Sequence, residues 1–67
     1  MRMTLNEIKC LAEVPAHWYL KEVYPVDEEG RATEGPLSQG ALYADKGEKF
    51  SLLFDDGRQF HRVKVTV

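Results

Sequence analysis

The stretch KFSLLFDDGRQFHRVKVT, residues 49–66, decides the fold of this 67-residue chain. Two runs rich in apolar residues, 49–55 and 58–66, flank Asp56-Gly57, and such a dipeptide between alternating apolar residues is typical of a type I′ β-hairpin. A two-residue loop fixes the register and pairs Asp55 with Arg58. The pairs that follow are Phe54 with Gln59, Leu53 with Phe60, Leu52 with His61, Ser51 with Arg62 and Phe50 with Val63.

The predicted hairpin has one apolar face, because successive side chains of a strand point to opposite sides of the sheet. That face collects Phe50, Leu52, Phe54, Val63 and Val65. The opposite face collects Ser51, Leu53, Asp55, Arg58, Phe60 and Arg62. Since a buried face specifies the register of a strand, the first set is expected to meet the core.

The region before the hairpin supplies a helix and a strand. Residues 4–14 are predicted to be helical, because Thr4 and Glu7 form a capping-box pattern and Pro15 ends the element. Its apolar face holds Leu5, Ile8, Leu11 and Ala12. Residues 17–24 are rich in aromatic and β-branched side chains and indicate a strand that Pro25 closes. Residues 27–40 form a long loop, and 41–45 a short strand before a turn at Lys46-Gly47.

These elements predict an α+β domain in which an N-terminal helix packs on an antiparallel sheet of three or four strands with a C-terminal β-hairpin. The alternative is a small SH3-like barrel that carries the helix as an appendage. The chain is short enough for a single domain over residues 1–67. Its core is thin, because a chain of this size buries only about 60% of its unfolded surface.

Composition and motifs argue against an enzyme. The two serines, Ser38 and Ser51, lie outside any Gly-x-Ser-x-Gly elbow, and the glycines are too scattered for a phosphate-binding loop. Cys10, His17 and His61 lack the spacing of a metal site, so neither metal nor cofactor is expected. Cys10 is the one cysteine and is interpreted as structural. The polar start and short apolar runs predict a cytoplasmic protein with no membrane span.

Charge is distributed unevenly. Residues 1–26 are neutral overall, residues 57–67 carry +3, and residues 27–56 carry −5. The acids of the middle segment are Asp27, Glu28, Glu29, Glu34, Asp45, Glu48, Asp55 and Asp56. They could form a negative surface that docks onto a basic groove of a partner protein. The alternative is that loops collect acids because loops are wet.

Two smaller surface features accompany the acids. Leu53 and Phe60 could supply an apolar anchor, or could be buried under the 27–40 loop. Arg58, Arg62 and Lys64 could contact nucleic acid, but three cations are a weak footprint for it. The preferred interpretation is a solvated strand face whose cations discourage edge pairing, so direct nucleic-acid binding is not expected.

In size, acidity, compact α+β pattern and lack of catalytic motifs, the chain resembles the small phage-encoded anti-CRISPR proteins. The resemblance implies a non-enzymatic inhibitor in the cytoplasm of a bacterial host that blocks the nucleic-acid groove of a CRISPR effector subunit. It carries no residue-level motif, so the partner-binding residues predicted here are the eight acids with Leu53 and Phe60. The alternative is an accessory module of a larger assembly that docks through a sheet edge or an apolar patch.

Overall fold

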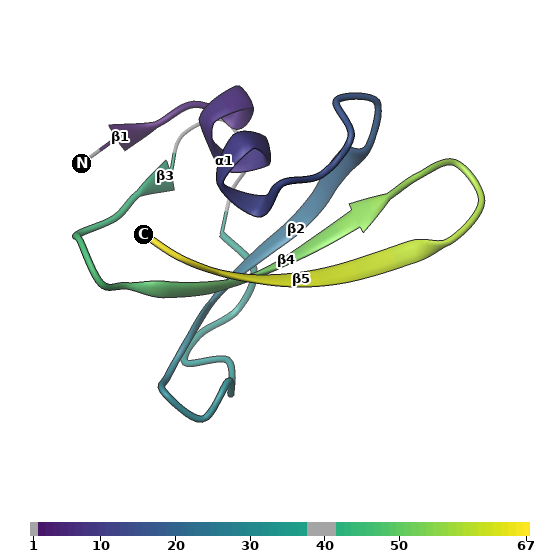
Figure 1. Cartoon of the computed structure of the whole chain (residues 1–67). Coiled ribbons are helices and arrows are strands. Elements are labelled where there is room, and N and C mark those ends of the chain that lie inside the picture. The colour runs from purple at the N-terminus through teal and green to yellow at the C-terminus, as the bar shows by residue number, and fades with distance from the viewer. Residues whose placement is uncertain (1, 38–41) are drawn as a thin grey trace.

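The computed structural model describes residues 2–37 and 42–67 and has the predicted α+β architecture. The elements are β1 (Arg2–Met3), α1 (Leu5–Ala12), β2 (Tyr19–Val26), β3 (Leu42–Tyr43), β4 (Lys49–Asp55) and β5 (Phe60–Thr66). An antiparallel sheet has the strand order β2-β4-β5, and the short strands β1 and β3 pair separately. Figure 1 shows α1 above one face of the larger sheet. Position 41, part of the strand predicted over 41–45, lies outside the described residues.

The hairpin is present, but its predicted register and turn type are wrong. Asp55 pairs with Phe60 and Phe50 with Val65, so every pair is shifted by two residues. The connection therefore spans 56–59, and among its residues only Gly57 has a positive φ, of 97°. A type I′ turn needs positive φ at both central residues. Asp56 instead accepts the backbone N–H groups of Arg58 and Gln59 at 2.7 and 2.8 Å, which closes a longer turn.

The predicted core face of the hairpin is confirmed, because a shift of two residues keeps each side chain on its original face. Phe50, Leu52 and Phe54 are the largest fully buried side chains. The remaining buried hydrophobic residues are Met3, Ile8, Leu20, Val23, Ala44 and Val65. Because Ile8 of α1 belongs to this core, the helix is part of the fold and not an appendage.

The helix begins as predicted and ends earlier. Thr4 and Glu7 form both halves of the capping box, with the Glu7 N–H donating to the Thr4 hydroxyl. Glu13 adopts a left-handed conformation and ends the helix after Ala12, so the predicted limit at residue 14 is wrong. On the predicted apolar face Ile8 is buried, whereas Leu5 and Leu11 are 46% and 37% exposed. The helix therefore covers the sheet along a narrow stripe.

Strand β2 starts later than predicted, at Tyr19, and continues through Pro25 to Val26. A proline is tolerated where its missing N–H faces away from the neighbouring strand. Pro25 meets this condition. Its carbonyl accepts the Thr33 N–H at 2.9 Å on the side of β2 away from β4, and the nitrogen of a strand residue points to the same side as its carbonyl. A β-bulge between Leu20 and Glu22 allows Leu20 and Val23, three positions apart, both to face the core.

Residues 31–37 lie along the side of β2 that is away from β4. Ala32 forms a bridge with Val26, and the Leu37 N–H donates to the Val23 carbonyl at 2.8 Å. Leu37 also packs against the core. This part of the predicted loop therefore covers the edge of β2.

Candidate binding surfaces

The face of the sheet opposite α1 carries exposed aromatic and cationic side chains. We call it the outer sheet face. It includes Tyr19, Lys21, Glu22 and Tyr24 of β2, Ser51, Leu53 and Asp55 of β4, and Phe60, Arg62 and Lys64 of β5. Two of its aromatic residues, Tyr19 and Phe60, are 57% and 58% exposed. Exposed aromatic side chains on a folded surface are typical of interaction sites.

The predicted apolar pair, Leu53 and Phe60, lies on this face but not as cross-strand neighbours. Leu53 pairs with Arg62, and Phe60 pairs with Asp55. Leu53 is half-buried, whereas Phe60 is exposed and has the Lys21 ammonium 4.9 Å from its ring centroid. Burial of Phe60 under the 27–40 loop is therefore wrong for the described part of that loop, because residues 31–37 follow β2.

Polar contacts hold the centre of the outer sheet face in place. Arg62 donates from Nη1 to the hydroxyl of Ser51 at 3.1 Å, which satisfies the one buried polar side chain among the described residues. The guanidinium carbon of Arg62 lies 6.0 Å from the ring centroid of Tyr24. The Tyr24 hydroxyl donates to Glu22 at 2.9 Å, and this hydrogen bond raises the pKa of Tyr24 above its ordinary value. These contacts hold the Arg62 side chain over the outer sheet face.

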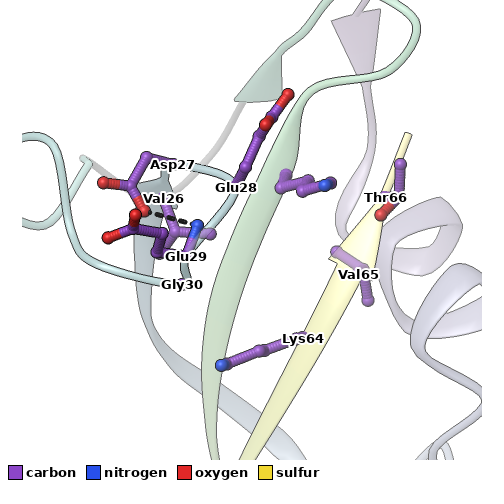
Figure 2. Close-up of a pocket in the computed structure, with 9 residues that line it drawn as sticks. Val26, Asp27, Glu28, Glu29, Gly30, Lys64, Val65 and Thr66 are labelled. Atoms are coloured by element: carbon purple, nitrogen blue, oxygen red, sulfur yellow. Dashed lines mark hydrogen bonds between the residues drawn. The ribbon is translucent and has the colours of Figure 1, made fainter.

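Lys64 reaches across β4 toward the loop that follows β2, as Figure 2 shows. Its ammonium lies close to Gly30, where an added Cβ would be only 2.6 Å from Nζ. Gly30 also has a positive φ of 86°, which a residue with a side chain rarely adopts. Glycine at this position therefore permits both the turn and the approach of Lys64. Lys64 and Lys49 line a hollow there together with the acids Asp27, Glu28 and Glu29.

The predicted acidic residues gather at two ends of the sheet rather than one. Asp27, Glu28 and Glu48 line a single hollow, because the loop after β2 and the turn before β4 are adjacent in space. Glu29 lines the neighbouring hollow, which also includes Lys49 and Lys64. Glu34 directly follows Thr33, and Thr33 lines the same hollow as Glu48. Asp55 and Asp56 lie at the far end of β4, about 20 Å away for a seven-residue strand.

Several of these acids also stabilise turns. Asp27 accepts the backbone N–H groups of Glu29 and Arg31, and Glu48 accepts that of Asp45 at 2.7 Å. Asp55 accepts the Gly57 N–H at 2.8 Å. Short acidic side chains commonly close turns in this way. Much of the acidity of residues 27–56 thus has a local structural role.

His61 lies on the inner side of the hairpin, and His17 is exposed before β2. The His61 ring stacks on Trp18 with ring centroids 4.1 Å apart, and its Nε2 lies 2.7 Å from Oδ2 of Asp56. The hydrogen bond from His61, with the backbone N–H groups of Gln59 and Arg58, lowers the pKa of Asp56 to about 2. These contacts attach the hairpin turn to the start of β2.

Among residues 2–37 and 42–67, no three His, Cys, Asp or Glu side chains are arranged to hold a metal ion. Cys10 is exposed on α1. No helix in the described residues is long and apolar enough to cross a bilayer. No protein-family model, curated protein or solved structure matches this chain, so the binding surfaces are interpreted from their own chemistry.

The sequence interpretation missed the contribution of β2 to the outer sheet face. Lys21 and Tyr24 join Phe60 and Arg62 there only because the bulge changes the alternation of β2. The spacing of Leu20 and Val23, three apart within a strand, is the signal that could have revealed the bulge.

Proposed function

We propose that this chain is a non-enzymatic binding protein that joins a larger assembly by docking another protein on its outer sheet face. The observation that carries the proposal is the exposure of Phe60 and Tyr19 on the face that α1 leaves uncovered. A small domain with a thin core gains stability from each large apolar group that it buries. Two aromatic side chains that stay more than half exposed on one face are therefore better explained by a partner than by folding.

The composition of the outer sheet face supports a protein partner. Aromatic residues and arginine are enriched at protein interfaces, where a few such anchors contribute most of the binding free energy. Phe60 and Arg62 would supply those anchors, and half-buried Leu53 would extend the apolar contact. The contacts of Arg62 with Ser51 and Tyr24 fix its position before binding, which lowers the entropic cost of association.

The test compares a variant of the outer sheet face with a control variant of another exposed aromatic residue. Affinity capture from a bacterial lysate followed by mass spectrometry identifies a candidate partner, and surface plasmon resonance then measures its affinity for purified variants. Phe60→Ala with Leu53→Ala is expected to weaken binding by about tenfold or more. Tyr43→Ala is the control, because Tyr43 is 71% exposed on β3 and outside the outer sheet face. Equal losses in both variants would contradict the proposal.

A second candidate function rests on the acidic end of the molecule, and it is the one that the likeness to anti-CRISPR proteins favours. Asp27, Glu28 and Glu48 come from two separate connections and line one hollow. A negative surface assembled from several connections would steer the chain onto a basic groove, including one that normally holds nucleic acid. In this case the protein would be an inhibitor or regulator of the partner.

Neutral isosteres distinguish this second candidate. Asp27→Asn, Glu28→Gln and Glu29→Gln together would slow association with the partner and reduce its salt dependence. Asparagine retains the oxygen with which Asp27 accepts hydrogen bonds from Glu29 and Arg31, so the turn is expected to persist. An unchanged association rate, together with loss of binding in the Phe60 and Leu53 variant, would exclude the acidic end as the docking surface.

A further inference from the structure

The two edges of the larger sheet differ. The β2 edge is occupied, because Val23 and Pro25 accept hydrogen bonds from residues 31–37 of the same chain. The other edge is β5, whose strand partner among residues 2–37 and 42–67 is β4 alone. Figure 1 shows β5 at the side of the sheet away from β2. An uncovered edge strand presents unpaired N–H and C=O groups and is a template for another strand.

The contacts of β2 and β5 show which backbone groups point out of the sheet. Antiparallel ladders alternate between hydrogen-bonded and non-bonded pairs. The carbonyls of Val23 and Pro25 point away from β4, so these residues form non-bonded pairs with Leu52 and Phe50. The backbone groups of residues 50, 52 and 54 therefore point away from β2 and bond to β5. The hydrogen bonds from the Asp56 N–H to the Gln59 carbonyl and from the Val67 N–H to the Glu48 carbonyl continue this alternation beyond the two ends of the β4–β5 pair. Residues 61, 63 and 65 therefore bond to β4, and residues 60, 62, 64 and 66 face outward.

The side chains of these same outward-facing residues give the edge its chemistry. Phe60, Arg62, Lys64 and Thr66 are all exposed. Residues 57–67 contain Arg58, Arg62 and Lys64 and no acidic residue, in a chain whose net charge is −2. Arg62 and Lys64 lean over the outer sheet face toward Ser51 and Gly30, and so away from the outward side of β5.

We propose that β5 binds an extended segment of the partner as an additional strand, and that this segment carries carboxylates at alternate positions with apolar residues between them. The inference rests on the proposed function and names the chemistry of the partner. The carboxylates would lie on the outer sheet face directly beside Arg62 and Lys64, because cross-strand neighbours of opposite charge stabilise a pair of strands. The apolar residues would lie on the inner side beside Val63, which is only partly buried.

The cations also explain why the edge is open to an acidic segment and closed to a second copy of the chain. Antiparallel pairing of β5 with itself about its centre would place Arg62 and Lys64 of one copy beside those of the other. Like charges at opposite positions destabilise a strand pair. The cations thus deter self-pairing, as the sequence interpretation expects, and at the same time select a partner strand of opposite charge.

The experiment uses the full chain and an eight-residue synthetic peptide with Glu at alternate positions and Val or Thr at the others. Amide hydrogen exchange followed by NMR reads each backbone group separately. In the free protein the amides of residues 61, 63 and 65 are expected to be protected by β4. On addition of the peptide, the amides of residues 60, 62, 64 and 66 should gain protection. A peptide with Gln in place of Glu should bind several-fold more weakly.

A matched pair of variants separates charge from backbone hydrogen bonding. Lys64→Gln removes the charge and keeps the N–H, so the affinity for the peptide should fall about two- to fivefold. Lys64→Pro also removes the outward N–H, and the fall should reach about tenfold or more. Proline is tolerated on an edge strand with this orientation. If the proline variant has lost its native NMR spectrum, the exchange pattern of the unmodified chain decides the question alone.

Other results would overturn the inference. Peptide binding without protection of residues 60, 62, 64 and 66 would place the contact elsewhere, and equal affinity for the Gln peptide would exclude charge selection. Protection that appears without peptide and grows with protein concentration would assign the edge to a second copy. A single-stranded oligothymidylate that competes with the peptide would assign the face to nucleic acid. Partner binding that depends on Phe60 but leaves the edge amides unprotected contradicts this inference and retains the proposed function.

Discussion

Nε2 of His61 and Oδ2 of Asp56 lie 2.7 Å apart and join the first residues of β5 to the turn that precedes them. The Asp56 carboxylate also accepts two backbone N–H groups within the turn. The imidazole in turn stacks on Trp18, which contacts Phe54 of the core with ring centroids 6.0 Å apart. One carboxylate therefore connects the hairpin turn to the core through two aromatic rings.

The lowered pKa of the Asp56 carboxylate predicts that the protein loses stability in acid. Its pKa in the folded protein is about 2, below the ordinary value of 3.8, because His61 and two backbone N–H groups favour the charged form. A lowered pKa contributes stability that is complete above the ordinary value and is lost as the pH falls through the folded value. The free energy of unfolding should therefore decrease between about pH 4 and pH 2, as measured by urea denaturation at a series of pH values.

The control for this prediction is Asp56→Asn, which keeps one acceptor oxygen and cannot titrate. Its unfolding free energy should be lower than that of the unmodified chain at pH 6 and should depend less on pH between 4 and 2. An equal decrease of the unfolding free energy between pH 4 and pH 2 in both proteins would show that another carboxylate is responsible.

Gly57 should be intolerant of side chains. Its φ of 97° lies in a region that β-branched residues avoid, and nothing lies within 4 Å of an added Cβ, so conformational strain alone is tested. Gly57→Val is expected to lower the unfolding free energy by about 1 kcal/mol or more. Gly35→Val is the matched control, because Gly35 has an equally open surrounding and no positive φ. Equal melting temperatures for the two variants would argue against the observed turn.

Neighbouring leucines on β4 test which face is buried. Leu52 is fully buried against the core, whereas Leu53 lies on the outer sheet face and is half-buried. Leu52→Ala should lower the unfolding free energy by about 2–5 kcal/mol. Leu53→Ala should have a clearly smaller effect, because it removes less buried area. Chemical denaturation measures both, and a reversed order would mean that β4 presents its other face to α1.

The contribution of the α1 capping box to stability should be measurable in a domain this small. Thr4 accepts the Glu7 N–H and Glu7 accepts that of Thr4, so Thr4→Ala leaves the Glu7 N–H without its side-chain acceptor. The expected cost is about 1 kcal/mol, which corresponds to a decrease of roughly 4–8 °C in melting temperature for a domain of 60–100 residues. Asn6→Ala is the control, since Asn6 is exposed on the same helical turn and outside the box.

The elements that could be predicted are those whose signals are local. The capping box and the alternation of Phe50, Leu52 and Phe54 each depend on residues close in sequence, and the structure has both. The pairing of β1 with β3 could not be predicted, because two-residue strands are too short to show a periodicity. The extension of β2 through Pro25 depends on the bond from Thr33, which lies eight residues away.

The turn shows why a correct face can accompany a wrong register. Asp56-Gly57 has the composition of a two-residue loop, but Asp56 uses its carboxylate to bind Arg58, Gln59 and His61. Those bonds favour a four-residue connection. Because the side-chain period of a strand is two, the shift of two residues left every inward residue inward.

The binding surfaces were predictable only in part, since they depend on which connections meet in space. Alternation places Phe60 and Leu53 together on the outer sheet face, as predicted from the sequence. The division of the acids between two ends follows from the lengths and directions of β2 and β4, and the sequence interpretation left that question open.

The bulge in β2 has a consequence for how this chain tolerates changes of length. Removing Lys21 would leave Leu20 and Val23 two positions apart, which is the spacing of a regular strand, so the buried residues could keep their places against Phe54 and Leu52. Removing a residue from the regular part of the same strand, such as Tyr24, would turn Pro25 and Val26 to the wrong faces. A family of such chains could therefore differ by one residue at position 21 and keep the same core, while gaining or losing the ammonium that covers Phe60.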